Sequence, residues 1–160
     1  MEISYAINLP RDALTVPMVR RLCQGAMTEL GVSRICVSEV AIAVTEACAN
    51  VIEHSSDTED DYEIRVAVNE DKCEIRVVDT GRGFDADSLS TTAADVSAER
   101  GRGIQLMRAL VDKVRFESKP EAGTIVHLEK RLDFNQDSPV LQLMERREAR
   151  SGDGPTSSSS

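Results

Sequence analysis

Tryptophan is absent from this chain of 160 residues, and two tyrosines and three phenylalanines are its only other large aromatic side chains. A chain with so few aromatic rings is poorly suited to stack on unpaired bases. Basic residues are also scarce, with 19 Lys and Arg against 28 Asp and Glu and a net charge of −9. Because binding to a phosphate backbone depends on clustered cations, this balance argues against DNA or RNA as a partner.

The cysteines and the apolar segments argue against further classes of protein. Cys23, Cys36, Cys48 and Cys73 form no Cys-x-x-Cys pair and have no histidine at metal-ligand spacing, so neither a disulfide framework nor a zinc site is expected. No uninterrupted apolar run approaches the roughly 20 residues of a membrane-spanning helix, and the N-terminus lacks a signal pattern. We therefore expect a cytoplasmic protein with no membrane partner and one aliphatic core.

Hydrophobic periodicity predicts the order of the elements, since alternation indicates strands and three- and four-residue spacing indicates helices. The patterns predict a strand at 2–9, helices at 15–30 and 33–54, a hairpin of strands at 62–68 and 73–77, a helix at 101–112, and strands at 114–117 and 124–131. This order is typical of an α+β fold, a two-layer sandwich in which a mostly antiparallel sheet is covered by helices. Residues 84–100, with weak periodicity, form a connection long enough to be a candidate lid.

The C-terminal part differs in composition from the rest. Ser138 and Pro139 have the pattern of an N-cap and a first-turn proline, which predicts a helix over 140–149. Residues 151–160 are almost entirely Gly, Pro, Ser and Thr, and are predicted to be disordered because they cannot bury enough apolar surface. The expected organisation is one domain over 1–132, a helical extension over 133–150 and a tail over 151–160.

Polar residues interrupt the apolar second helix. Glu46, Asn50 and His54 are four residues apart and share one helix face. A solvated helix edge is the simplest interpretation of such a triplet. However, residues 37–52 are mostly Ala, Val, Ile and Cys, so the helix is expected to be buried nearly all round. A carboxylate there needs a metal, a water or a reacting hydroxyl as its partner, and an asparagine oxygen suits a hard cation.

Asp79 ends the second strand of the hairpin on the same face as Ile75 and Val77, and is therefore expected to point toward the core. One interpretation is an acidic turn residue that closes a strand. The other is a carboxylate at the floor of an apolar slot that accepts a hydrogen bond from an exocyclic amine, with Gly81 and Gly83 allowing the backbone to approach a flat ring.

The segment Gly101-Arg102-Gly103-Ile104 is expected at the start of a helix, where free backbone N–H groups bind phosphate. This segment matches neither the dinucleotide-binding fingerprint nor the Walker P-loop, so taken alone it is weak evidence for a phosphate-binding site. Thr124, in the last strand, is expected to face the same interior as Asp79, although an inward threonine often only fills space.

Taken in order, four segments resemble the nucleotide boxes of the GHKL ATPase superfamily. They are Glu46-Ala-Cys-Ala-Asn50, Asp79-Thr-Gly81-Arg-Gly83, Gly101-Arg-Gly103-Ile-Gln-Leu-Met107 and Gly123-Thr124. The small size, the Glu-x-x-x-Asn form of the first box and the short lid look like the anti-sigma regulatory factor serine kinases. The resemblance covers about residues 3–132.

The resemblance implies ATP and Mg²⁺ as cofactors. It implies that Asn50 coordinates the metal, that Asp79 binds the adenine amino group and that Glu46 is the general base. The full set of implied nucleotide-binding residues is Asn50, Asp79, Gly81, Gly83, Gly101, Arg102, Gly103, Ile104 and Thr124.

The implied function is that of a homodimeric anti-sigma factor that binds a sigma factor and phosphorylates a serine of an anti-sigma antagonist of the STAS fold. An alternative is a binding module that uses ATP only to order its partner surface. A detached catalytic domain of a sensor histidine kinase fits less well, because His54 and His127 are in the wrong contexts for a phosphoacceptor. A small α+β domain whose glycines are only turns remains the simplest alternative.

Overall fold

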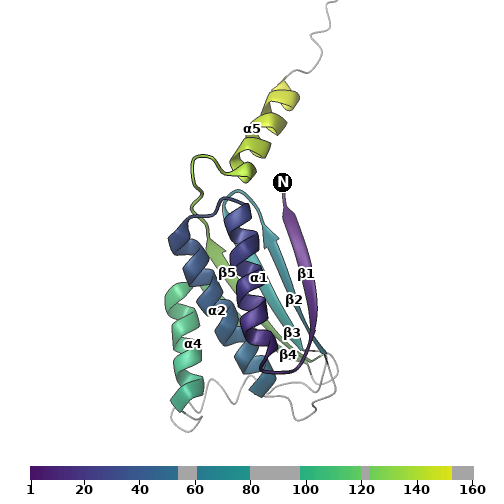
Figure 1. The fold of residues 1–160 in the computed structure, drawn as a ribbon, viewed down its shortest axis with the longest axis vertical. Helices are drawn as coiled ribbons and strands as arrows, with labels where there is room; N and C mark the ends of the chain where they lie inside the picture. The colour runs from purple at the N-terminus through teal and green to yellow at the C-terminus, as the bar shows by residue number, and fades with distance from the viewer. Residues whose placement is uncertain (54–60, 80–97, 120–122, 153–160) are drawn as a thin grey trace, which may run out of the picture.

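The computed structural model describes residues 1–53, 61–79, 98–119 and 123–152. In this part of the chain, α1, α2 and α4 lie on one face of a five-stranded sheet, and α5 projects away from one end of the sandwich (Figure 1). The predicted two-layer α+β architecture is therefore confirmed.

The sheet is antiparallel throughout, with the strand order β1-β2-β3-β5-β4. The strands are β1 (Ile3–Pro10), β2 (Asp61–Val68), β3 (Lys72–Asp79), β4 (Lys113–Lys119) and β5 (Gly123–Arg131). Side chains of β2 and β3 alternate between buried and more exposed positions, as expected for a sheet with one face against helices and the other not covered by any described helix.

The helices are α1 (Thr15–Glu29), α2 (Arg34–Glu53), α4 (Ala98–Leu110) and α5 (Pro139–Gly152). α2 lies between α1 and α4 and packs on β3 and β5. It is long and apolar enough to pass a length-and-composition test for a membrane span, but more than half of its most apolar stretch is buried in the fold. Its Val40, Ala43, Val44 and Ala47 are fully buried, so the role of a core helix accounts for this composition.

The core is aliphatic, as the composition predicts. It joins residues of the sheet to the inner faces of α1, α2 and α4, with Tyr62 as its largest fully buried side chain. The four cysteines are free and buried, and burial raises the pKa of the thiols of Cys23, Cys48 and Cys73. These thiols therefore act as small apolar groups in the core.

The predicted elements agree with the structure to within a few residues, with two differences. α4 begins at Ala98, three residues before Gly101, so the prediction that the glycines open this helix is wrong. The physical reason is that Ala98, Glu99 and Arg100 are strong helix formers that extend the helix toward the N-terminus. α5 also continues through Gly152, so the prediction that the disordered tail begins at residue 151 is wrong for its first two residues, which complete the last turn of this helix. Most of the candidate lid and the tail from residue 153 lie outside the described residues.

Candidate nucleotide site

Two polar residues of α2 face α4. Asn50 is buried and Glu46, one turn earlier, is partly buried. Gly103 of α4 lies directly against both: a Cβ atom built on Gly103 would be 2.8 Å from Glu46 Oε2 and 3.8 Å from Asn50 Oδ1. The missing side chain of Gly103 thus allows α4 to approach the carboxylate and the amide closely.

A cavity of about 310 Å³ opens at this contact between α2 and α4. Its lining residues are mostly polar: Glu46, Ala49, Asn50, Glu53, Arg102, Gly103 and Leu106. Two carboxylates beside a phosphate chain would repel it unless a cation lies between them, and amide and carboxylate oxygens are ligands that Mg²⁺ prefers. The donor set therefore fits a metal-bridged phosphate group, with the exposed Arg102 as a further cation at the edge.

Asp79 occupies the last position of β3 and is only 3% exposed. Ile75 and Val77 are buried on the same face, so the prediction that this acid points toward the core is confirmed. The register of β3 and β5 places Thr124 directly opposite Asp79, so the two positions share one face of the sheet.

Arg11 is a charged partner of Asp79 that the sequence analysis did not identify. The two side chains form an ion pair, and both are almost fully buried. Arg11 directly follows β1, at the same end of the sheet as Asp79. In the strand register, Pro10 of β1 lies opposite Asp61 of β2, and the next residue of β2, Tyr62, lies opposite Asp79 of β3. A buried carboxylate requires this kind of compensation. A cation after an edge strand is a weak sequence signal, and only the strand register reveals its partner.

Thr15 and Tyr62 form a second polar contact near the same strand ends. Their hydroxyl oxygens are 2.6 Å apart, and the Thr15 hydroxyl is also 2.6 Å from the carbonyl oxygen of Asp12. Burial raises the pKa of Tyr62 to about 12, so its phenol stays protonated and hydrogen-bonded at neutral pH.

Other predicted site residues are placed differently or not described. Gly101 and Gly103 lie inside α4, so their N–H groups are not among the free ones of its first turn. A Cβ on Gly101 would meet nothing within 4 Å, in contrast to Gly103. Ile104 follows in α4 and packs partly buried against the core. His54, Gly81 and Gly83 lie outside the described residues.

Comparison with known proteins identifies the family. Residues 9–130 match the family model described as the histidine kinase-like ATPase domain. The chain belongs to this ATPase family. It is 30% identical over 138 residues to the serine-protein kinase RsbW of Halalkalibacterium halodurans, an alignment that covers 81% of this chain and 84% of the relative. It is 32% identical over 139 residues to the RsbW of Bacillus pumilus, with 79% and 85% of the two chains covered.

A solved structure of the RsbU and RsbW domains of a Mycobacterium tuberculosis protein shares the fold of this histidine kinase-like ATPase. The TM-score is 0.62 at 18% sequence identity, and the alignment covers 81% of this chain and 32% of that longer one. The resemblance of the four boxes to the GHKL superfamily is thereby confirmed at the level of family and fold. In this family member, the α2–α4 contact and Asp79 lie on the helix-covered side of the sheet.

Proposed function

We propose that this protein is an ATP-dependent serine kinase that also acts as an anti-sigma factor. It binds a sigma factor, and it uses Mg-ATP to phosphorylate a serine of an anti-sigma antagonist of the STAS fold. The observation that carries the proposal is the close contact of Glu46 and Asn50 with Gly103, beside a cavity suited to metal-bound phosphates. The relatives named serine-protein kinase RsbW support the same activity.

Each residue has a defined role in this proposal. Mg²⁺ held at Asn50 would neutralise the phosphate charge beside the carboxylates that line the cavity. Glu46 accepts the proton of the serine hydroxyl while the serine oxygen bonds to the terminal phosphorus and the bond from that phosphorus to the leaving ADP oxygen breaks. Because phosphoryl transfer requires little covalent help, positioning and charge neutralisation supply most of the rate.

Asp79 recognises the base in the same proposal. An ionised carboxylate only accepts hydrogen bonds, so it matches the exocyclic amine of adenine and opposes the carbonyl that guanine has at that position. The ion pair with Arg11 supports this role because it stabilises the charged form of a buried acid. We therefore expect selectivity for ATP over GTP, with Gly81, Gly83 and Thr124 completing the adenine site.

The test separates nucleotide binding from transfer. The protein, labelled ATP, Mg²⁺ and the cognate candidate antagonists are incubated, and a serine of one antagonist is expected to become labelled. Glu46→Gln is expected to bind ATP normally while losing transfer. Asp79→Asn is expected to weaken ATP binding by about 1–3 kcal/mol, because a buried group loses its matched partner.

Glu29→Gln serves as the control, since Glu29 is an exposed residue at the end of α1. It removes the same charge as Glu46→Gln and should leave both binding and transfer unchanged. Transfer by Glu46→Gln at the wild-type rate would refute the assigned base. Normal ATP binding with no labelled antagonist would refute the kinase and favour an ATP-dependent binding module.

We also propose that the protein is a cytoplasmic homodimer whose partners are proteins. The net charge of −9 supports protein partners over nucleic acid. Sedimentation of the purified chain at several concentrations tests the dimer, and a single monomer mass at all of them would refute it.

A further inference from the structure

The face of the sheet opposite the helices carries a row of basic side chains. In the strand register, Arg65 of β2 lies directly opposite Arg76 of β3. His127 of β5 lies opposite Arg76 on the other side, and Arg115 of β4 lies opposite His127. We call these four residues the basic row. Its three arginines are exposed, and the row crosses four adjacent strands on the side of the sheet that none of the described helices covers.

The basic row is unfavourable for the isolated protein. Like charges directly opposite each other on neighbouring strands are destabilising, and here Arg65 faces Arg76. Arg65 and Arg115 form ion pairs with Glu63 and Glu117 on their own strands, and both guanidinium groups are largely exposed while the glutamates are less so. Glu117 also lies 3.2 Å from His127 Nε2. Exposed ion pairs contribute little to stability, so both guanidinium groups can exchange their partners at low cost.

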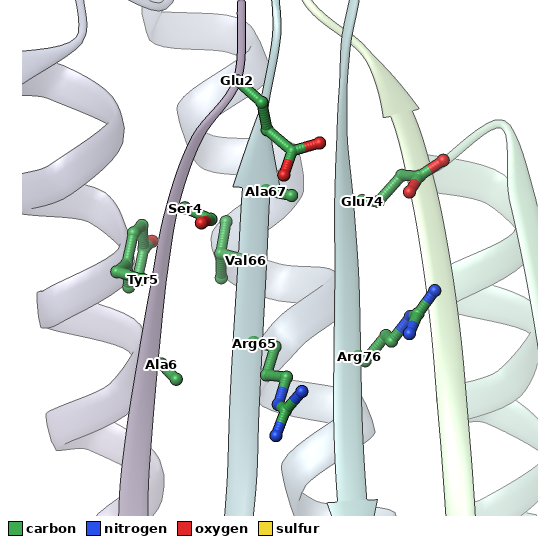
Figure 2. A pocket seen from close by; sticks show the side chains of 9 residues that line it. All are labelled: Glu2, Ser4, Tyr5, Ala6, Arg65, Val66, Ala67, Glu74 and Arg76. Atoms are coloured by element: carbon green, nitrogen blue, oxygen red, sulfur yellow. The ribbon is translucent and has the colours of Figure 1, made fainter.

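Two hollows follow the basic row across the sheet. One, of about 480 Å³, lies over β1, β2 and β3; the other, of about 290 Å³, lies over β3, β5 and β4. Arg76 and Glu74 line both hollows, so the two hollows adjoin at these side chains, and we call them together the trough. Figure 2 shows Arg65 and Arg76 on neighbouring strands, with the small side chains of Ser4 and Ala6 beside Arg65 and the carboxylate of Glu2 at the far end of this hollow.

We propose that this trough is a docking surface for an acidic, extended segment of a partner protein, whose carboxylates pair with Arg65, Arg76 and Arg115. Arginine binds carboxylates through two parallel hydrogen bonds, which supplies both attraction and orientation. Such a segment would replace the weak pairs with Glu63 and Glu117 and relieve the repulsion along the row. The surface lies on the side of the sheet opposite the proposed nucleotide site, so this inference does not depend on the kinase activity.

The surrounding charges favour an acidic peptide segment over a nucleic acid and over a second copy of this chain as the occupant of the trough. Glu63 and Glu117 flank the row on one side, and Glu74 and Glu129 flank it on the other. Glu74 and Glu129 form ion pairs with Lys72, and Glu129 also pairs with Lys113. The four acids interrupt the positive surface that a continuous phosphate backbone needs, whereas a peptide can place neutral or basic residues beside them. A second copy packed face to face and centred on the row would place arginine against arginine.

The test uses a fluorescein-labelled peptide of six Glu-Ser repeats and the full-length protein at low salt. We expect binding by fluorescence anisotropy, with amide shifts in nuclear magnetic resonance spectra concentrated at Arg65, Arg76, His127 and Arg115. Arg76→Gln is expected to weaken binding by about tenfold or more, because charge-assisted hydrogen bonds are lost. Arg146→Gln, which removes the same charge from an exposed position of α5, should leave binding unchanged.

Four results would overturn the proposal. They are the absence of binding, amide shifts located mainly on the helices, equal weakening by the two variants, and equally tight binding of a single-stranded oligonucleotide or of a Gln-Ser peptide. A dimer that Arg76→Gln dissociates, and that excludes the peptide, would assign the trough to a second copy instead. ATP binding by Arg76→Gln should equal that of the wild type, which separates this test from that of the kinase.

Discussion

Single residues set the geometry of the site. Gly103 illustrates this because its Cα lies where any side chain would meet Glu46 Oε2 at 2.8 Å. Gly25, in α1, is also inside a helix, but a Cβ there would meet nothing within 4 Å. Both positions gain helix propensity when Gly is replaced by Ala, so only the contact with Glu46 distinguishes them.

We therefore predict that Gly103→Ala and Gly25→Ala separate stability from activity. Both variants should fold, and Gly25→Ala should gain roughly 0.5–1 kcal/mol of stability in a denaturant titration. In Gly103→Ala the flexible end of Glu46 moves aside, so stability should change little while phosphoryl transfer falls by about tenfold or more. Equal transfer rates in the two variants would show that the position of Glu46 does not matter.

At the scale of elements, the C-terminal extension is fastened to the turn between α1 and α2. Gly31 has a φ of 76°, and a Cβ there would lie 2.6 Å from the Cα of Ser138. The Ser138 hydroxyl donates a hydrogen bond to the carbonyl of Leu30 at 2.7 Å and accepts one from the N–H of Val140 at 3.2 Å. Ser138 therefore caps α5, as predicted, and also joins it to the core domain.

Replacing either side of this contact should loosen α5. Gly31→Ala requires an unfavourable backbone conformation and meets the Ser138 backbone, so we expect a loss of roughly 1–3 kcal/mol. Ser138→Ala should cost about 1 kcal/mol through the lost cap. Hydrogen exchange should accelerate in α5 while the amides of β3 stay protected. Uniform acceleration across the chain would show instead that the contact stabilises the whole domain.

At the scale of the whole molecule, the buried thiols and phenols link stability to alkaline pH. Burial raises the pKa of Cys73 from 9.0 to about 12 and that of Tyr62 from 10.0 to about 12. Above pH 9 the unfolded chain loses these protons while the folded chain keeps them. Ionisation thus favours the unfolded state, and the stabilisation from the neutral groups declines as the pH rises from about 9 to 12.

We predict that the melting temperature is nearly constant from pH 7 to 9 and then falls steeply. Cys73→Ala should be less stable at pH 7 because it leaves a cavity, but it should lose less stability between pH 9 and 11. Circular dichroism melts of the two proteins across this range measure the difference. Parallel curves for the two proteins would show that Cys73 does not contribute to the alkaline transition.

The spacing of apolar residues predicts most of the helices and strands, because this spacing depends only on residues that are close together within one helix or strand. The alternation Cys73, Ile75, Val77 already indicates both the strand and the inward direction of Asp79. Glycines predict a helix boundary at Gly101, whereas the strong helix formers before it extend α4 back to Ala98. The roles that the resemblance implies for Gly81 and Gly83 stay predictions.

The sequence by itself determined the helices and strands, the aliphatic core and the four boxes, since each depends on residues that are close along the chain. Only the tertiary structure decided that Arg11 pairs with Asp79, that Gly103 lies against Glu46 and that four basic side chains form a row. These contacts join segments distant in sequence, and strand register and helix packing set them. A shift of one residue in register would turn each side chain of a strand to the opposite face.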